Sequence, residues 1–451
     1  MSLAAACHER GLSTAGFSTD PYLNAYYGYD RGFDAFFELF DVTALWQHVC
    51  RDYIGHYARR FRDGAIDRAA LQALVEPLLV RLLSYAADYY DRKLRAPERA
   101  LCTMHSPLYA QDFVASAARI RSERAALERA PTAYVDTLLQ MPDVTGAEQA
   151  TGNASTRTRV DDAFMRVADA LGAYSPKRYQ PTVDAHDVVS LADAWIGAQG
   201  NAPFFAWLSL NDVHDLNFCH SWMSRATWRY RRRARKASDL SRLQADLSLQ
   251  FVDDAIQRLL NALRRRGLLD STLIVVCADH GRLDATSTSA GMFGDALIRV
   301  PLLFWHAGIE AAIDAHPCAL LDVAPTMLEL MGLGAEPAFR GVSLLSPKAA
   351  QRQHVIVEQL GGGPCDLART DPTICLVGRT YKYAWAADGR EWFNDLLERP
   401  RRGFVAPADD IARALLAPLR EIARQRYAEI RAGAGLLPVE PSSVNDQHPA
   451  V

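Results

Sequence analysis

Two short polar segments of the sequence contain residue types that can hold a cation and transfer a proton. His214 lies just after the apolar run Phe204–Leu210. Asp279 and His280 lie just after a second apolar run, Thr272–Cys277. A carboxylate beside an imidazole can bind a divalent cation, which polarises a bound oxyanion as an ester bond breaks. A further imidazole such as His214 could donate a proton or a hydrogen bond to the leaving or bridging oxygen.

The elements around these residues predict how they are positioned. The two apolar runs alternate with two amphipathic helices, Val188–Ile196 and Leu243–Arg266. This order is typical of an α/β fold, in which crossover helices connect the strands of a parallel sheet. Ligands of such sheets bind just beyond the carboxyl ends of the strands. If the two strands are neighbours, His214, Asp279 and His280 face one pocket.

A structural interpretation of the same residues stays open. Asp279 could cap the following turn or helix, because its side chain can accept hydrogen bonds from nearby backbone N–H groups. His280 could be a loop residue whose hydrogen bonds are satisfied locally. Taken without further context, the pair favours this structural interpretation.

The rest of the chain predicts a layered protein with a helical segment. A helix around Leu3–Arg10 precedes a short strand, Thr14–Phe17, and a helical pattern extends from Phe33 to about Leu171. After Ser346 the apolar runs shorten, which predicts antiparallel strands followed by a helix. The predicted strands are His354–Glu358, Thr373–Val377 and Tyr381–Trp385, and the predicted helix is Ile411–Arg431.

Composition excludes several classes of protein. The chain has 451 residues, of which 49% are hydrophobic and 23% charged, so it is neither disordered nor fibrous. A formal net charge of -3 argues against a general polyanion binder, and we expect no nucleic-acid partner. No apolar run reaches the length of a membrane span, and Met1–Glu9 is too short for a signal peptide. The sequence as printed predicts a cytoplasmic protein. If an N-terminal signal precedes the printed sequence, the location of the protein is unknown.

Several segments together resemble the sulfatase family of the alkaline phosphatase superfamily. The longest, Phe251–Gly281, is similar to the family pattern vDd.i..ll..L...Gl.d.Tliv..sDHG, and it includes Asp279 and His280. The segment Pro203–His214 is similar to the pattern PFFl.lsl.dpH. The other similar segments are Gly11–Leu23, Asp30–Asp34, Ile298–Leu302, Leu321–Leu328, Arg340–Leu345, Thr380–Tyr383 and Glu391–Asp395.

The resemblance implies a fold and an activity. It implies an alkaline-phosphatase-like α/β domain over residues 1–346, with a mostly parallel sheet, flanking helices and a helical insertion at about 40–185. Residues 347–451 would form a small α+β subdomain that ends in a mobile tail. The implied activity is hydrolysis of a small anionic ester, a sulfate ester or a phosphate ester, by metal-assisted nucleophilic attack. By resemblance, Asp279 and His280 would bind a divalent cation, most plausibly calcium, and His214 would be catalytic.

Other parts of the family pattern are missing from this sequence. No Cys-x-Pro-x-Arg or Ser-x-Pro-x-Arg nucleophile motif is present, and neither is the aspartate pair that the family places on an early strand. Thr19, Pro21, Ala290 and Gly294 stand where the family commonly has lysine, histidine, lysine and tyrosine. We therefore expect an N-terminally truncated or degenerate member that binds the cation weakly or not at all and is inactive as this chain. The alternative is a non-catalytic sulfatase-like protein that binds an anionic ligand or a partner, with the basic segment Arg225–Lys236 near its cleft.

Overall fold

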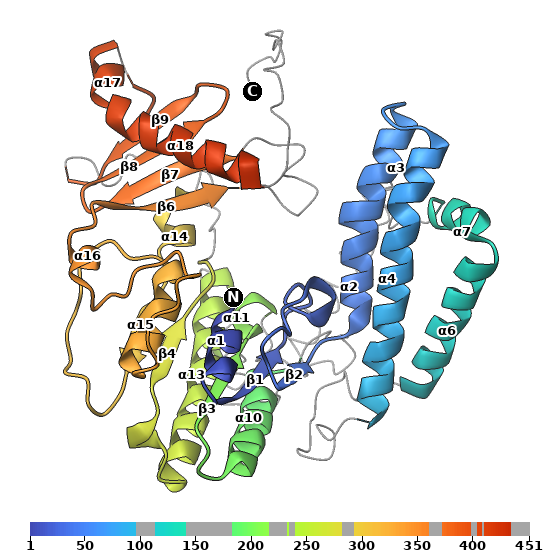
Figure 1. Ribbon diagram of the computed structural model, residues 1–451, viewed down its shortest axis with the longest axis horizontal. Helices are drawn as coiled ribbons and strands as arrows, with labels where there is room; N and C mark the ends of the chain where they lie inside the picture. The colour runs from blue at the N-terminus through green and yellow to red at the C-terminus, as the bar shows by residue number, and fades with distance from the viewer. Residues whose placement is uncertain are drawn as a thin grey trace. The chain divides into compact units, whose positions relative to one another are not determined.

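A computed structural model shows the arrangement of the chain (Figure 1) and describes residues 1–95, 113–140, 183–215, 232–233, 240–281, 293–359, 372–397, 404–407 and 410–433. These residues form two compact units, unit 1 from Met1 to Leu269 and unit 2 from Asp270 to Val451. The boundary that the sequence predicts at residue 346 falls inside unit 2, between α15 (Val323–Leu330) and α16 (Pro347–Ala350).

Unit 1 contains a three-stranded parallel sheet in the order β2-β1-β3. β1 (Ser13–Ser18) lies in the middle and pairs with β2 (Ala35–Glu38) and with β3 (Phe204–Leu208). The strands predicted at 14–17 and 204–210 are therefore confirmed. The helical pattern predicted from Phe33 is wrong for β2, because four residues carry too little periodicity to reveal a strand that forms only by pairing with β1.

Two helices of unit 1 pack against each other beside this sheet. They are α10 (Ala185–Gln199) and α13 (Leu240–Arg265), which share an apolar core. Asp184 caps α10, because its side chain accepts hydrogen bonds from the backbone N–H groups of the first turn. Gly267 follows α13 with φ +70, a left-handed conformation that glycine adopts without strain. The core residues shared by the two helices are Ala185, Val189, Leu247, Phe251 and Ala255.

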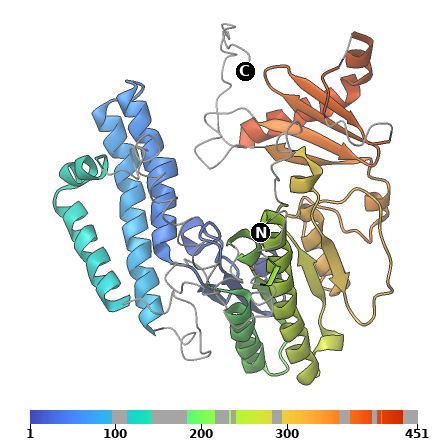
Figure 2. The same cartoon turned by 180° about the vertical axis from the view of Figure 1, so that it is seen from behind.

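A helical block completes unit 1. Figures 1 and 2 both show α4 (Arg68–Arg95) between α3 (Gly55–Arg62) and α6 (Phe113–Arg129). Pro131 begins α7 (Pro131–Leu138), because a proline has no backbone N–H and is tolerated in the first turn of a helix. The block also contains α2 (Val42–His48), which continues into a π-helical turn at Val49–Ile54.

Buried Glu38 of β2 ties the helical block to the sheet. Its carboxylate accepts hydrogen bonds from the Ala25 backbone N–H at 2.9 Å and the Tyr85 hydroxyl at 2.5 Å, and it pairs with Arg92 at 2.7 Å. Tyr85 and Arg92 both belong to α4. Among the described residues, α4 alone has the length and hydropathy of a membrane span, but the buried positions along it pack within the block. We interpret α4 as the core helix of the block.

Unit 2 begins with two paired strands, β4 (Ile274–Cys277) and β5 (Leu302–Trp305). β4 matches the predicted run Thr272–Cys277. The two strands run antiparallel to each other, whereas the alternation of helices and strands predicts a parallel sheet. Among the described residues between the two strands, the only helix is α14 (Asp295–Ile298), which is too short to be a crossover helix. A strand without such a crossover can return antiparallel to its neighbour.

A four-stranded antiparallel sheet follows in the order β6-β7-β8-β9. The three predicted strands of this region are confirmed. The helix predicted at 411–431 is split into α17 (Asp410–Leu415) and α18 (Ala417–Gly433). The reason is Pro418, which has no backbone N–H and is accommodated best in the first turn of a new helix. The strands are β6 (His354–Gln359), β7 (Thr373–Gly378), β8 (Tyr381–Ala386) and β9 (Glu391–Asp395).

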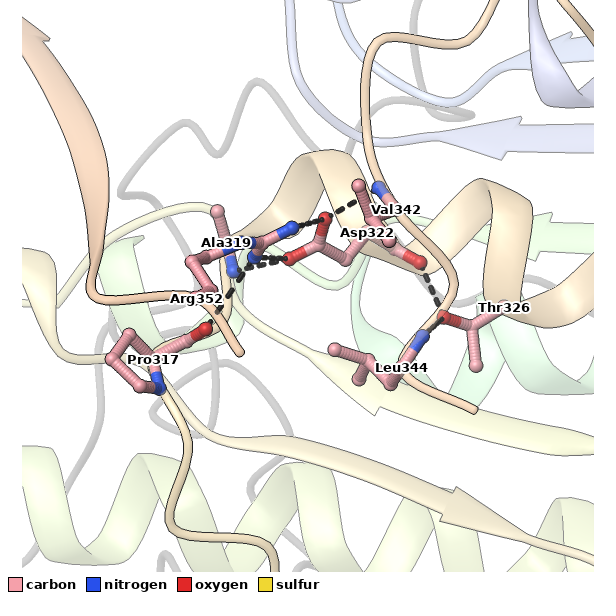
Figure 3. Close-up of polar contacts among 7 residues, drawn as sticks. All are labelled: Pro317, Ala319, Asp322, Thr326, Val342, Leu344 and Arg352. Atoms are coloured by element: carbon pink, nitrogen blue, oxygen red, sulfur yellow. Dashed lines mark hydrogen bonds and ion pairs between the residues drawn. The ribbon is translucent and has the colours of Figure 1, made fainter. Parts of the chain in front are cut away.

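A buried ion pair holds three segments of unit 2 together (Figure 3). The Asp322 carboxylate, 1% exposed, receives two hydrogen bonds from Arg352, at 2.5 and 2.9 Å. It also accepts hydrogen bonds from the backbone N–H groups of Ala319 and Val342, at 2.9 and 2.8 Å. Four donors therefore satisfy one buried charge, which fixes the start of α15 against the loop at 340–344 and against Arg352.

Candidate active site

The carboxyl ends of the three parallel strands of unit 1 lie at one edge of the sheet. His214 follows β3 at this edge, in the single helical turn α11 (Asp212–Asp215). Its backbone N–H donates to the carbonyl of Asn211 at 3.1 Å, and its side chain is exposed. Unit 1 therefore places His214 where the sequence predicts it, beyond the carboxyl end of a parallel strand.

Two polar residues at the same edge have structural roles. Asp212 is fully buried and accepts a hydrogen bond from the backbone N–H of Ala185 at 3.0 Å, at the start of α10. Thr19 is also fully buried, and its hydroxyl donates to the carbonyl of Ser209 at 2.9 Å. This bond joins the loops that follow β1 and β3. Thr19 therefore stabilises the edge and presents no cation to an anionic substrate.

In unit 2, Asp279 and His280 form an exposed pair on the turn that follows β4. Their side chains are 78% and 60% exposed, and Oδ2 of Asp279 lies 3.6 Å from Nε2 of His280. The other carboxylate oxygen of Asp279 accepts a hydrogen bond from the His280 backbone N–H at 2.7 Å. This last contact is the turn-capping role of the structural interpretation. It uses one oxygen and leaves Oδ2 directed toward the imidazole.

The hydrogen bond of the His280 ring determines which nitrogen can bind a ligand. Nδ1 lies 2.8 Å from the carbonyl oxygen of Gly281, which can only accept, so Nδ1 carries the hydrogen. In the neutral ring, Nε2 then has a free lone pair. A ring whose second nitrogen donates to a backbone carbonyl is the usual arrangement of a histidine that binds a metal.

The donor atoms of Asp279 and His280 fit part of a cation site. Metal–ligand bonds of about 2.0–2.6 Å allow one ion to reach a carboxylate oxygen and an imidazole nitrogen 3.6 Å apart. Calcium takes about six to eight oxygen-rich ligands, so this pair supplies a minority of them. Within the part of the chain that the structure describes, no group of three or more histidine, cysteine, aspartate or glutamate side chains is arranged to hold a metal.

The turn that carries the pair rests directly on α14. The Gly281 N–H donates to the carbonyl of Leu297 at 2.6 Å. A Cβ atom at Gly281 would lie 2.0 Å from the carbonyl oxygen of Ala296, so only glycine permits this approach. The position of His280 therefore depends on the position of α14.

Four described cysteines are poor candidates for a nucleophile. Burial raises the pKa of Cys7 to about 11 and that of Cys375 to about 12. Desolvation raises the pKa of the Cys277 thiol, and the negative charge of Asp279 raises it further. The pKa of Cys318 is raised by desolvation and by Asp322. Because the thiolate is the reactive form, these thiols are weak nucleophiles at neutral pH.

The structure brings some of the predicted site residues together. Asp279 and His280 contact each other in unit 2, whereas His214 belongs to unit 1, so its approach to them stays a prediction. Ala290 and most of Arg225–Lys236 lie outside the described residues, with Arg232 and Arg233 the exceptions.

Sequence reasoning missed Lys382, which is 2% exposed and pairs with Asp295 of α14. The signal that could have found it is a lysine inside the short strand Tyr381–Ala386, where its neighbours on both sides are apolar or aromatic. A cation at such a position is buried when the strand is covered on that face, and it then needs a specific partner.

Comparison with known proteins gives one family. Residues 144–333 match the family model of Sulfatase. A choline-sulfatase of Rhizobium meliloti (strain 1021) is 28% identical over 159 residues, which cover 34% of this chain and 30% of the relative. Arylsulfatase K of Mus musculus is 26% identical over 146 residues, 31% of this chain and 25% of the relative. The aligned segment thus spans less than a third of either relative.

Solved structures are similar to part of the chain. The phosphonate monoester hydrolase of Agrobacterium radiobacter aligns with a TM-score of 0.38 and 17% identity, covering 58% of this chain and 64% of that one. A protein of the alkaline phosphatase superfamily from Vibrio parahaemolyticus aligns with a TM-score of 0.40 and 17% identity, covering 57% and 58%.

Proposed function

We propose that this chain contributes Asp279, His280 and His214 to a sulfate-ester hydrolase site, because residues 144–333 match the family model of Sulfatase. Asp279 and His280 would hold a divalent cation, calcium in the first instance, and His214 would donate a proton to the leaving oxygen. The observation that carries the proposal is the Asp279–His280 pair, whose Oδ2 and Nε2 atoms lie 3.6 Å apart on an exposed turn.

The proposed division of labour follows from the chemistry of the side chains. When bound, the cation would polarise the ester oxygens and offset the charge that develops as the bond breaks. Asp279 contributes negative charge and His280 a neutral nitrogen, and the hydrogen bond from Nδ1 to Gly281 keeps the ring in that tautomer. His214 is exposed beyond the end of β3, so its side chain is accessible to an ester that binds at this edge of the sheet.

We further propose that residues 1–451 alone bind such an ester without turning it over. The printed sequence contains no Cys-x-Pro-x-Arg or Ser-x-Pro-x-Arg motif, and the raised pKa values of Cys7, Cys277, Cys318 and Cys375 keep those thiols protonated. A cation held by two side chains polarises an ester but does not replace a nucleophile.

Phosphate esters are the second substrate class. The cations that the family uses to neutralise sulfate oxygens are not supplied by Thr19 or Pro21, and Thr19 already donates its hydroxyl to Ser209. With fewer cations around the oxyanion, the site is expected to discriminate less between sulfate and phosphate esters. The fold itself does not decide between them.

The test is a parallel measurement of binding and turnover with p-nitrophenyl sulfate and p-nitrophenyl phosphate in the presence of calcium. We expect weak binding of the esters, no release of nitrophenol, and loss of the calcium-dependent part of binding in His280→Ala. The matched control is His316→Ala, which removes an exposed histidine that pairs with Asp314 in the same unit. Equal effects of the two variants would refute the proposed site, and nitrophenol release by the wild-type chain would refute the proposed inactivity.

A further inference from the structure

Lys382 is a buried cation in the four-stranded sheet of unit 2. It lies in β8 on the face shared with Cys375 and Ala384, and it is 2% exposed. Its Nζ donates to Oδ1 of Asp295 at 2.5 Å and to the carbonyl of Phe293 at 3.1 Å. An ammonium group removed from water is costly unless it is paired and hydrogen-bonded, so both contacts are needed to keep it there.

These two contacts fasten the start of α14 to the sheet. Phe293 packs into the same apolar cluster, against Cys375 and Ala384, while Lys382 holds its carbonyl. Asp295 is the first residue of α14, and its carboxylate is held by the same ammonium group. One side chain therefore binds both the segment that enters the helix and the first turn of the helix.

Two backbone carbonyl groups of α14, those of Ala296 and Leu297, contact the turn that carries the proposed cation ligands. The carbonyl of Leu297 accepts the Gly281 N–H at 2.6 Å, and the carbonyl of Gly281 in turn accepts Nδ1 of His280 at 2.8 Å. The backbone of Gly281 packs so closely against the carbonyl oxygen of Ala296 that a Cβ atom would lie 2.0 Å from it. A movement of α14 toward the turn would therefore displace the turn. A continuous set of contacts thus leads from Lys382 through α14 to the His280 ring.

We propose that Lys382 is a positioning residue that holds α14 in place and thereby orients His280 and Asp279 toward one cation. This inference rests on the proposed function for the identity of the ligand. The positional part stands on contacts within unit 2 and can be measured without any metal. Lys382 itself touches neither the cation nor the ester.

The first experiment measures hydrogen exchange at the Gly281 amide by site-resolved mass spectrometry in the metal-free protein. Lys382→Met keeps the length of the side chain and removes its charge and donors. We expect exchange at Gly281 to become about 10- to 100-fold faster, because charge-assisted hydrogen bonds that fix the start of α14 are lost. Lys382→Arg, which retains the charge, should restore most of the protection.

Two further variants separate positioning from general loss of stability. Arg420→Met breaks the ion pair with Glu391 in the same sheet without touching α14, so Gly281 should keep its protection. Asp295→Asn changes a residue whose side chain is 57% exposed, so the protein should fold, yet exchange at Gly281 should accelerate. Equal acceleration in Arg420→Met, or unchanged exchange in both Lys382→Met and Asp295→Asn, would overturn the inference.

A manganese titration of the same variants tests the role of the ligand. We expect Lys382→Met to weaken Mn²⁺ binding by about tenfold or more, and Lys382→Arg to restore it, whereas Arg420→Met should leave it unchanged. If Gly281 loosens in Lys382→Met while its Mn²⁺ affinity equals that of the wild type, the inference is wrong. If His280→Ala binds Mn²⁺ as well as the wild-type chain does, the proposed function fails. The hydrogen-exchange data still decide whether Lys382 positions α14.

Discussion

Replacing Asp322 with alanine should destabilise unit 2 by an amount that follows from the contacts in Figure 3. The substitution removes an acceptor from two backbone N–H groups, those of Ala319 and Val342. It also leaves the Arg352 guanidinium, 18% exposed, with only a 3.4 Å contact to the carbonyl of Pro317 among the interactions drawn there. Removing one partner of a buried ion pair costs about 3–5 kcal/mol.

Urea denaturation followed by tryptophan fluorescence measures this loss. For an m value of about 2 kcal/mol/M, a loss of about 4 kcal/mol lowers the midpoint by about 2 M urea. The double variant Asp322→Ala with Arg352→Met should lose less than the sum of the two single variants, because the second substitution removes the cation left without a partner. A loss below about 1 kcal/mol in Asp322→Ala, or strict additivity, would refute the reasoning.

The pH dependence of the same pair gives a second measurement. Burial by itself raises the pKa of Asp322, but hydrogen bonds from Arg352, Val342 and Ala319 and the charge of Arg352 lower it below its ordinary value of 3.8. A carboxyl whose folded pKa is depressed contributes stability above its unfolded pKa, and this contribution is lost as the pH falls through the folded pKa. The wild-type chain should therefore lose this increment below about pH 4, while Asp322→Ala has none to lose.

Three further substitutions test other parts of the structure. Gly281→Ala should weaken cation binding and cost about 1–3 kcal/mol in a urea titration, because the new methyl group would meet the Ala296 carbonyl at 2.0 Å. Glu38→Gln should destabilise unit 1 by about 2 kcal/mol and increase proteolysis of the helical block, since its charge-assisted bonds to α4 are weakened. Thr19→Val should cost about 1 kcal/mol by thermal denaturation and leave ester binding unchanged, because its hydroxyl donates to the carbonyl of Ser209.

Apolar runs and helix boundaries were enough to predict most elements of the fold. Strands such as β1, β3 and β4 are short, continuous apolar segments, and α13 has the helical spacing of apolar residues and a glycine stop. β2 was missed because four residues do not establish a period. The antiparallel pairing of β5 with β4 was also missed, because the direction of a strand depends on its long-range partner and not on its own residues.

The candidate site was predictable only in part, for a related physical reason. His214, Asp279 and His280 follow apolar strands in the sequence, so their place at strand ends could be read locally. Lys382 could not be assigned in this way, because its role depends on which face of β8 is covered and on a partner 87 positions away. Contacts at such separation are visible only once the sheet is formed.

The central claim is that the Asp279–His280 pair is the part of this chain that binds a divalent cation. The most direct measurement is a Mn²⁺ titration followed by electron paramagnetic resonance, which counts free ion, on the wild-type chain, His280→Ala and the control His316→Ala. We predict a dissociation constant of about 1 mM for the wild type and the control, and no binding at this site in His280→Ala. Unchanged binding in His280→Ala, or tight stoichiometric binding of calcium by the chain alone, would contradict the claim.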